Sequence, residues 1–190
     1  MNAIPKTKVF NRIIQFYLLE CPVRTRIQIP VKDRDPNDSQ AKYKCLFKKV
    51  SQRGLTFEER GLDGPNLNVL RAAMKRVTNV KLIVVDTEDE IKSISSELDL
   101  LSKQEYIIIK RNEGNVSVTE GYFYCIRNAF AHGDFDVDGS TYRLRNVVHG
   151  EIRGVAKLLE ISLVKWIDLV SMSIEDIKSA GYDIFNSRRD

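Results

Sequence analysis

The sequence predicts a mainly α-helical protein, an antiparallel helical bundle with a short β-hairpin insertion after the helix that ends near residue 132. Three observations lead to this fold class. Apolar residues recur at spacings of three and four along most of the chain, as they do in helices that bury one face. Residues that favour helix starts and ends flank several of these stretches. Strand-like alternation beside a good turn signal occurs around Asp138-Gly139.

The composition predicts one globular domain spanning residues 1–190. Hydrophobic residues make up 43% of the chain and charged residues 29%, which is ordinary for a globular protein. Neither a repeat nor a low-complexity segment divides it. The formal net charge of +4 permits a polyanionic partner without requiring one.

Targeting and redox features predict a cytoplasmic protein. The apolar runs at 82–85 and 106–109 are too short to span a bilayer, and the N-terminus does not resemble a signal peptide. Cys21, Cys45 and Cys125 have neither disulfide-framework nor zinc spacing, which fits a reducing compartment. We therefore expect no membrane association, no metal and no cofactor.

The first third of the chain is expected to contain two helices. Residues 6–20 carry apolar positions at helical spacing, and Pro22 limits how far that helix continues. The polar, proline-bearing stretch 30–40 reads as a loop. A second helix is predicted over 40–53, ended by Gly54, with a stripe formed by Leu46, Phe47 and Val50.

Two further helices are predicted in the middle of the chain, separated by an ambiguous segment. Pro65 suits the first turn of a helix over 61–79, and acidic residues suit the first turn of a helix over 86–103. The apolar run 80–85 fits either a buried strand or a helix extension. The run 105–110 looks locally like a strand, although a helix also fits.

The last third is predicted as helix, hairpin and helix. Ser117 and Glu120 form a capping-box pattern for a helix that Gly133 ends. The hairpin around Asp138-Gly139 follows. One long helix is then expected over 150–172, with a short helix in the tail after it, and its buried stripe consists of Ile152, Val155, Leu158, Leu159, Leu163 and Trp166.

Arg127, Asn128 and His132 near the end of the 117–132 helix are the candidate catalytic residues. Five positions rotate two helical side chains apart by about 140°, so Arg127 and His132 would converge only if the helix ends near His132. The negative end of the helix dipole favours a protonated histidine, as general acid–base chemistry requires.

This residue set suits RNA cleavage without a metal. Arg127 would hold the phosphate, His132 would transfer a proton, and Asn128 would orient either group. One copy supplies one proton carrier, whereas a symmetric dimer supplies two. The plainer alternative is that Arg127 pairs with an acidic neighbour and that His132 merely ends the helix.

The Arg-Asn-x-x-x-His stretch, followed by glycine, resembles the signature of the HEPN superfamily. Arg127, Asn128 and His132 match that motif position for position. The resemblance implies an all-α bundle that dimerises and brings two motifs into a shared cleft. It also implies a metal-independent endoribonuclease of toxin–antitoxin, phage-defence or RNA-processing systems, in some cases with an antitoxin or other protein partner. Some members of the superfamily are silent dimers that bind RNA or a protein.

Three hairpin residues are the candidate RNA-binding residues. Arg143 and Arg145 alternate on a strand close to the motif, where they would contact an RNA backbone, and the ring of Tyr142 would stack on a base. His149 is expected to lie at the start of the last long helix. Cys125 is expected to be a small core residue rather than a nucleophile.

Overall fold

The computed structural model describes residues 7–30, 43–49, 53–111 and 117–180, and it shows an α/β protein instead of the predicted helical bundle. The mainly α, all-helical prediction is therefore wrong. The helices are α1 (Lys8–Gln15), the π-helix η1 (Phe16–Glu20), α2 (Pro65–Val77), α3 (Glu88–Asp99), α4 (Val118–His132), α5 (Glu160–Val170) and α6 (Ile174–Ser179). The strands are β1 (Arg24–Pro30), β2 (Tyr43–Lys49), β3 (Val80–Val85), β4 (Glu105–Lys110), β5 (Phe135–Asp138), β6 (Thr141–Val148) and β7 (Glu151–Leu159).

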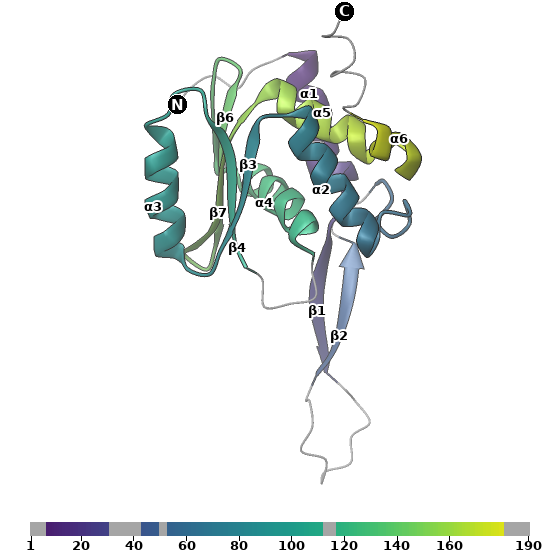
Figure 1. Ribbon diagram of the computed structural model, residues 1–190. Helices are drawn as coiled ribbons and strands as arrows, with labels where there is room; N and C mark the ends of the chain where they lie inside the picture. Colours follow the sequence, from purple (N-terminus) through teal and green to yellow (C-terminus); the bar gives the residue numbers. More distant parts are fainter. Residues whose placement is uncertain (1–6, 31–42, 50–52, 112–116, 181–190) are drawn as a thin grey trace, which may run out of the picture.

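A five-stranded sheet in the order β3-β4-β7-β6-β5 organises the fold. β3 and β4 are parallel and the other neighbours are antiparallel. α3 covers one side of the sheet, and α4 lies on the other side together with α2 and α5 (Figure 1). β1 and β2 form a separate antiparallel arm that extends away from the sheet (Figure 1).

The predicted second helix is wrong because β2 occupies most of its range. β2 pairs with β1 from Arg24 opposite Lys49 to Pro30 opposite Tyr43. Its sequence also carries a period of two, since Tyr43, Cys45 and Phe47 alternate with other residues, and this competes with the helical stripe. Val50, a member of the proposed stripe, lies outside the described residues.

The long helix predicted over 150–172 is half strand and half helix. Residues 151–159 form β7, the central strand of the sheet, and α5 begins only at Glu160. β7 lies between β4 and β6 and is covered on both faces, so its apolar residues need not alternate. The apolar residues of such a strand can therefore recur at spacings of three and four, as those of a helix do.

The two ambiguous runs are both strands. β3 and β4 run parallel, and α3 makes the crossover connection that parallel strands require. β4 is buried from Glu105 to Ile109, which again accounts for an apolar run without alternation. Other local expectations are confirmed: Pro65 lies in the first turn of α2, and the tail contains α6.

The predicted hairpin exists, but it is the edge of the sheet and not an insertion into a bundle. β5 pairs with β6 from Asp138 opposite Thr141 to Phe135 opposite Leu144. Gly139, the first of the two turn residues, has φ 57°, a conformation that glycine adopts without steric cost. β6 continues beyond β5 and pairs with β7, which ties the hairpin to the rest of the sheet.

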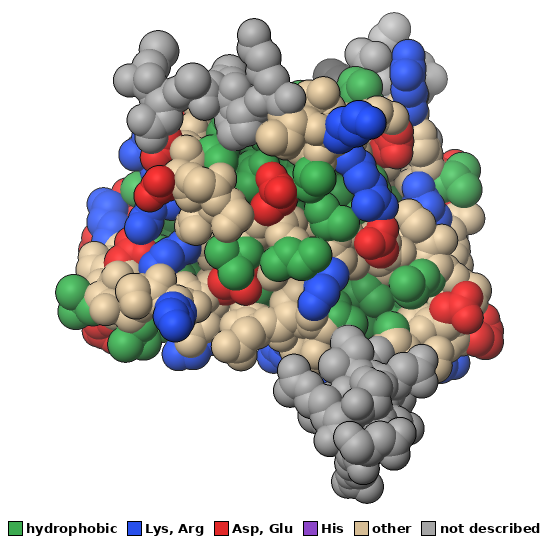
Figure 2. Space-filling view, turned by 90° about the horizontal axis from the view of Figure 1, so that it is seen from above, with side chains coloured by type: hydrophobic (Ala, Val, Ile, Leu, Met, Phe, Trp, Pro, Cys, Tyr) green, Lys and Arg blue, Asp and Glu red, His purple; other side chains and the backbone are tan. Residues whose placement is uncertain are grey.

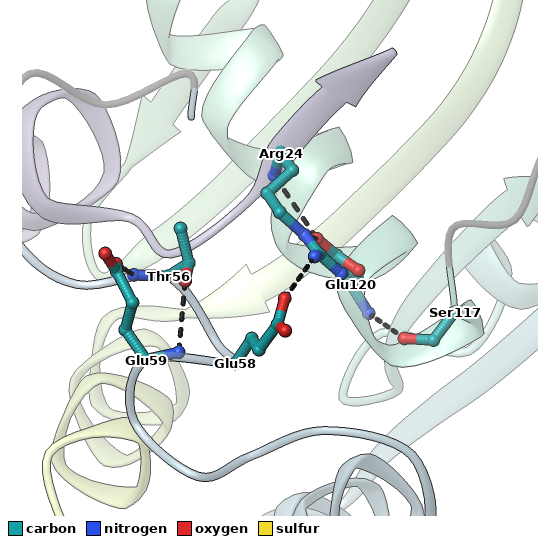
Figure 3. A network of polar contacts seen from close by, with 6 residues as sticks. All are labelled: Arg24, Thr56, Glu58, Glu59, Ser117 and Glu120. Carbon is teal, nitrogen blue, oxygen red and sulfur yellow. Dashed lines mark hydrogen bonds and ion pairs between the residues drawn. The ribbon is translucent and has the colours of Figure 1, made fainter. Parts of the chain in front are cut away.

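A polar network at the start of α4 joins this helix to β1 (Figure 3). Ser117 caps α4, as predicted, by accepting a hydrogen bond from the Glu120 backbone N–H at 3.1 Å. The buried Glu120 carboxylate accepts hydrogen bonds from the backbone N–H and Nε of Arg24 at 3.2 and 3.3 Å. Arg24 Nη1 also pairs with Glu58 at 2.8 Å. Only the serine half of the predicted capping box is therefore formed, and Glu120 anchors the base of the arm instead.

α4 approaches the sheet most closely at two glycines. A Cβ on Gly154 of β7 would lie 2.7 Å from Cys125 Sγ and 3.0 Å from the Ile108 carbonyl oxygen. A Cβ on Gly121 of α4 would meet only the flexible end of Ile109, at 2.9 Å. Of these two positions, Gly154 therefore leaves less room for an added side chain.

Substitution of Gly154 with Ala is expected to lower the free energy of unfolding by about 1–3 kcal/mol, because the added methyl group overpacks a site with a backbone wall. Gly121→Ala is the matched control. It should change stability by less than about 1 kcal/mol, since the gain in helix propensity offsets the contact with Ile109. Urea unfolding measures both variants, and equal stability losses would contradict the proposed role of Gly154.

Candidate functional site

α4 positions all three motif residues, but it does not bring them together. The helix runs without a break from Val118 to His132, and Gly133 caps it in the left-handed conformation with φ 71°. The helix thus ends at His132, as the sequence predicts. Both residues belong to α4, so the rotation of about 140° between them persists, and the described residues show no hydrogen bond between Arg127 and His132.

Arg127 is a half-buried cation without a carboxylate partner among the described residues. Its Nη1 donates to Asn128 Oδ1 at 3.0 Å. Its Nε is buried and makes no hydrogen bond with the described residues. The plainer sequence alternative, in which an acidic neighbour neutralises this arginine, is not seen in the described part of the chain.

Asn128 continues the contact into the interior. Asn128 and Asn146 are each only 4% exposed, and Asn128 Nδ2 donates to Asn146 Oδ1 at 3.3 Å. Asn146 belongs to β6, so this bond joins α4 directly to the sheet. Asn146 was not among the candidate residues predicted from the sequence. In the sequence it could have been recognised as a polar residue that follows Tyr142 and Leu144 at the strand period of two and therefore faces the core.

A cavity of about 180 Å³ lies beside Asn146, and its wall includes Lys110, Tyr124 and Arg153. Arg153 reaches this cavity because the pairing of β6 with β7 is irregular there. Asn146 lies opposite Gly154 and Val147 lies opposite Ile152, so Arg153 is the extra residue of a β-bulge. We call this cavity the Asn146 pocket.

Glu151 holds the two cations at the rim of the Asn146 pocket. Its Oε1 pairs with Lys110 Nζ, and its Oε2 pairs with Arg153 Nη2 at 2.8 Å. The three side chains are each partly exposed. Glu88 also interacts with Lys110 but is paired with Lys92, so these five side chains together carry a net charge of +1.

His132 and the two hairpin arginines lie near a different cavity. Gly133, the residue after His132, lines a cavity of about 370 Å³ together with Arg143 and Arg145. Ser95 and Asp99 of α3 also line it, so it opens on the face of the sheet opposite α4. The His132 side chain is exposed and makes no hydrogen bond or ion pair with the described residues.

Both hairpin arginines are exposed, as a phosphate-contacting role requires, but they already have partners. Arg143 pairs with Asp99 at 3.1 Å, and Arg145 pairs with Asp134 at 3.5 Å. Exposed pairs of this kind are weak and can exchange partners. The sheet separates both arginines from Arg127.

Tyr142 does not have the exposed ring that base stacking requires. It is fully buried, it stacks on Phe10 with 6.3 Å between ring centroids, and its hydroxyl donates to Glu160 at 3.1 Å. Burial is the largest cause that raises the pKa of this hydroxyl above its ordinary value. Alternation along β6 places Tyr142 on the core face and Arg143 on the open face.

The remaining sequence candidates have structural positions. His149 is exposed in the turn between β6 and β7, with φ 52°, and not at the start of a helix as predicted. Cys125 is a buried core residue, as expected. Among the described residues, no three histidine, cysteine or carboxylate side chains gather as a metal would require.

The face of the molecule seen from above carries charges of both signs (Figure 2). Basic and acidic side chains are interspersed with apolar ones on this face (Figure 2).

No helix in the described part of the chain combines the length and apolar character needed to cross a membrane. Comparison of the chain with protein-family models, with curated proteins and with solved structures gives no match.

The Cys21 and Cys125 thiols are predicted to be unreactive in the folded protein. Burial raises the pKa of each to about 12, so roughly one molecule in ten thousand carries a given thiolate at pH 8. In a Cys45→Ser variant, a chromogenic disulfide reagent at pH 8 should therefore label neither thiol. Both thiols should react in denaturant. Rapid labelling of the folded variant would contradict the inert role of these cysteines.

Proposed function

We propose that the chain is a metal-independent endoribonuclease that acts as a homodimer. In this proposal Arg127 stabilises the negatively charged phosphorane, His132 transfers a proton, and Asn128 holds the Arg127 guanidinium in place. The supporting observation is that Arg127 has no counter-ion among the described residues. Within this part of the chain the half-buried guanidinium donates only to a neutral amide, which is unfavourable by itself, and an RNA phosphate would relieve that cost.

The separation of Arg127 from His132 makes the second copy necessary. On one helix the two side chains point to sides about 140° apart, so a single chain does not present both to one phosphate. In a two-fold dimer, Arg127 of one copy and His132 of the other would face the same phosphate. The exposure of His132 is compatible with this arrangement.

The reaction needs two proton transfers and one charge stabiliser. The 2′-hydroxyl gives its proton to a base and attacks phosphorus, and the bond to the 5′-oxygen breaks as an acid protonates that oxygen. At each site a single His132 imidazole would fill both roles in turn, first by taking the proton of the 2′-hydroxyl and then by giving it to the 5′-oxygen. Arg127 would offset the charge of the phosphorane between the two steps.

A catalytically silent dimer that binds RNA is the second candidate. The same separation favours it, because Arg127 retains its affinity for phosphate even if no histidine reaches the reacting oxygens. In that case Arg127 contributes to binding and His132 is an ordinary residue at a helix end.

Cleavage of RNA in the presence of EDTA tests the nuclease proposal. His132→Ala should lower the rate by roughly 10²–10⁴-fold, because the proton carrier is lost. Arg127→Ala should lower it by roughly 10²-fold or more, because the phosphorane loses its cation. His149→Asn and Arg111→Ala, which change an exposed histidine and an exposed arginine elsewhere, should retain the wild-type rate. Cleavage that survives both motif substitutions contradicts the proposal.

Mixing the two inactive variants tests the two-copy arrangement. If each site takes Arg127 from one copy and His132 from the other, a mixed dimer of Arg127→Ala and His132→Ala has one intact site. Random exchange of subunits should then restore about a quarter of wild-type activity. Inactive mixtures, despite subunit exchange shown with labelled chains, would place the whole site within one chain.

A further inference from the structure

The bond between Arg127 and Asn128 fixes the orientation of two buried amides. An arginine side chain only donates hydrogen bonds, so Asn128 must turn its Oδ1 toward Arg127 Nη1. The Nδ2 group of Asn128 is then directed at Asn146, whose Oδ1 accepts. The Nδ2 group of Asn146 is left over, and it makes no hydrogen bond with the described residues.

This unused donor belongs to the Asn146 pocket. Asn146 is 4% exposed and lines the pocket, and its unused Nδ2 group is not fully enclosed by protein. An acceptor bound in the pocket would lie beside this donor. A buried side chain with an unused donor calls for an acceptor in that space.

The rest of the pocket offers positive charge. Lys110 and Arg153 line it and carry a net charge of +1 together with Glu151. Among the described residues, the lining of the pocket includes a lysine, an arginine and the amide of Asn146 but no carboxylate, which is the wrong chemistry for a metal site. A compact anion that accepts several hydrogen bonds fits these groups.

The volume of the pocket limits the ligand. Its 180 Å³ is smaller than the roughly 300–1,000 Å³ of pockets that enclose a whole ligand. Only the end of a larger molecule would enter. Tyr124, which is half-exposed on α4, lies in the wall where a planar group could pack against its ring.

We propose that the Asn146 pocket binds the terminal phosphate of a nucleotide, with Asn146 Nδ2, Lys110 and Arg153 as donors. Arg127 acts here as a positioning residue, because its contact with Asn128 sets which end of the Asn146 amide faces the phosphate. The phosphate belongs either to a free mononucleotide or to the end of an RNA strand. The RNA source rests on the proposed nuclease function, whereas the phosphate site rests on the pocket alone.

Isothermal titration with inorganic phosphate and with AMP, compared with adenosine, tests the site. Phosphate and AMP should bind, and adenosine should not. Asn146→Asp should weaken phosphate binding by roughly tenfold or more, because a carboxylate still accepts from Asn128 but repels the ligand. Asn68→Asp is the matched control, since Asn68 is exposed on α2 and its Oδ1 also accepts from an arginine. It should bind as wild type does.

A gain of affinity separates a phosphate site from a merely structural amide pair. Glu151→Gln removes the anion that neutralises Lys110 and Arg153, and it should tighten phosphate binding by roughly three- to tenfold. Loss of folding would not produce this gain. Absence of phosphate binding in wild type, or equal affinities of wild type, Asn146→Asp and Glu151→Gln, would overturn the proposal.

A short oligoribonucleotide with a 5′-phosphate, compared with its 5′-hydroxyl form, distinguishes the two sources. Tighter binding of the phosphorylated strand, lost in Asn146→Asp, assigns the pocket to an RNA end. Equal binding of both strands, together with binding of AMP, assigns it to a free nucleotide. Phosphate binding by a protein that never cleaves RNA would retain this site and refute the proposed nuclease function.

Discussion

The arrangement of the site depends on the close approach of α4 to the sheet at Gly154. The missing side chain on β7 leaves room for Cys125, so that α4 rests against the central strands. One turn farther along α4, Asn128 then lies within hydrogen-bond distance of Asn146 on β6. At the start of the helix, Glu120 binds Arg24 and joins the same helix to the arm. A shift of α4 would therefore alter the amide pair, the Asn146 pocket and the base of the arm together.

Local signals in the sequence predicted several elements correctly, but not the fold class. Pro65, Ser117, Gly133 and the Asp138-Gly139 hairpin act through nearby backbone, so their effect can be read from neighbouring residues. β4 and β7 are buried on both faces by partners distant in sequence, and such strands lack the alternation that identifies a strand. For this reason the sequence of β7 was predicted as part of a helix. Because β7 is the central strand, the five-stranded sheet was not predicted either.

The candidate site was predictable only in part. Arg127 and Asn128 were found because they are adjacent in a recognisable motif, but Asn146 is 18 residues away and meets Asn128 only through the packing of α4 on β6. Lys110 and Arg153 come from two further strands. The position of Arg153 at the pocket depends on a β-bulge, which no local sequence pattern predicts. Conversely, Tyr142 was expected to be exposed beside Arg143, and strand alternation places the two on opposite faces of the sheet.

Phosphate binding in the Asn146 pocket depends most on the direction of hydrogen bonding from Arg127 through Asn128 to Asn146. Side-chain amide signals in NMR spectra, recorded as inorganic phosphate is added, test this direction. We expect the Nδ2 signals of Asn146 to shift in the wild-type protein, and those of the exposed Asn68 to remain in place. The Asn146 shift should be lost in Arg127→Leu, where nothing fixes the amides. If the Asn146 signals do not shift when phosphate is added, or shift equally in Arg127→Leu, then Arg127 does not orient the Asn146 amide toward phosphate.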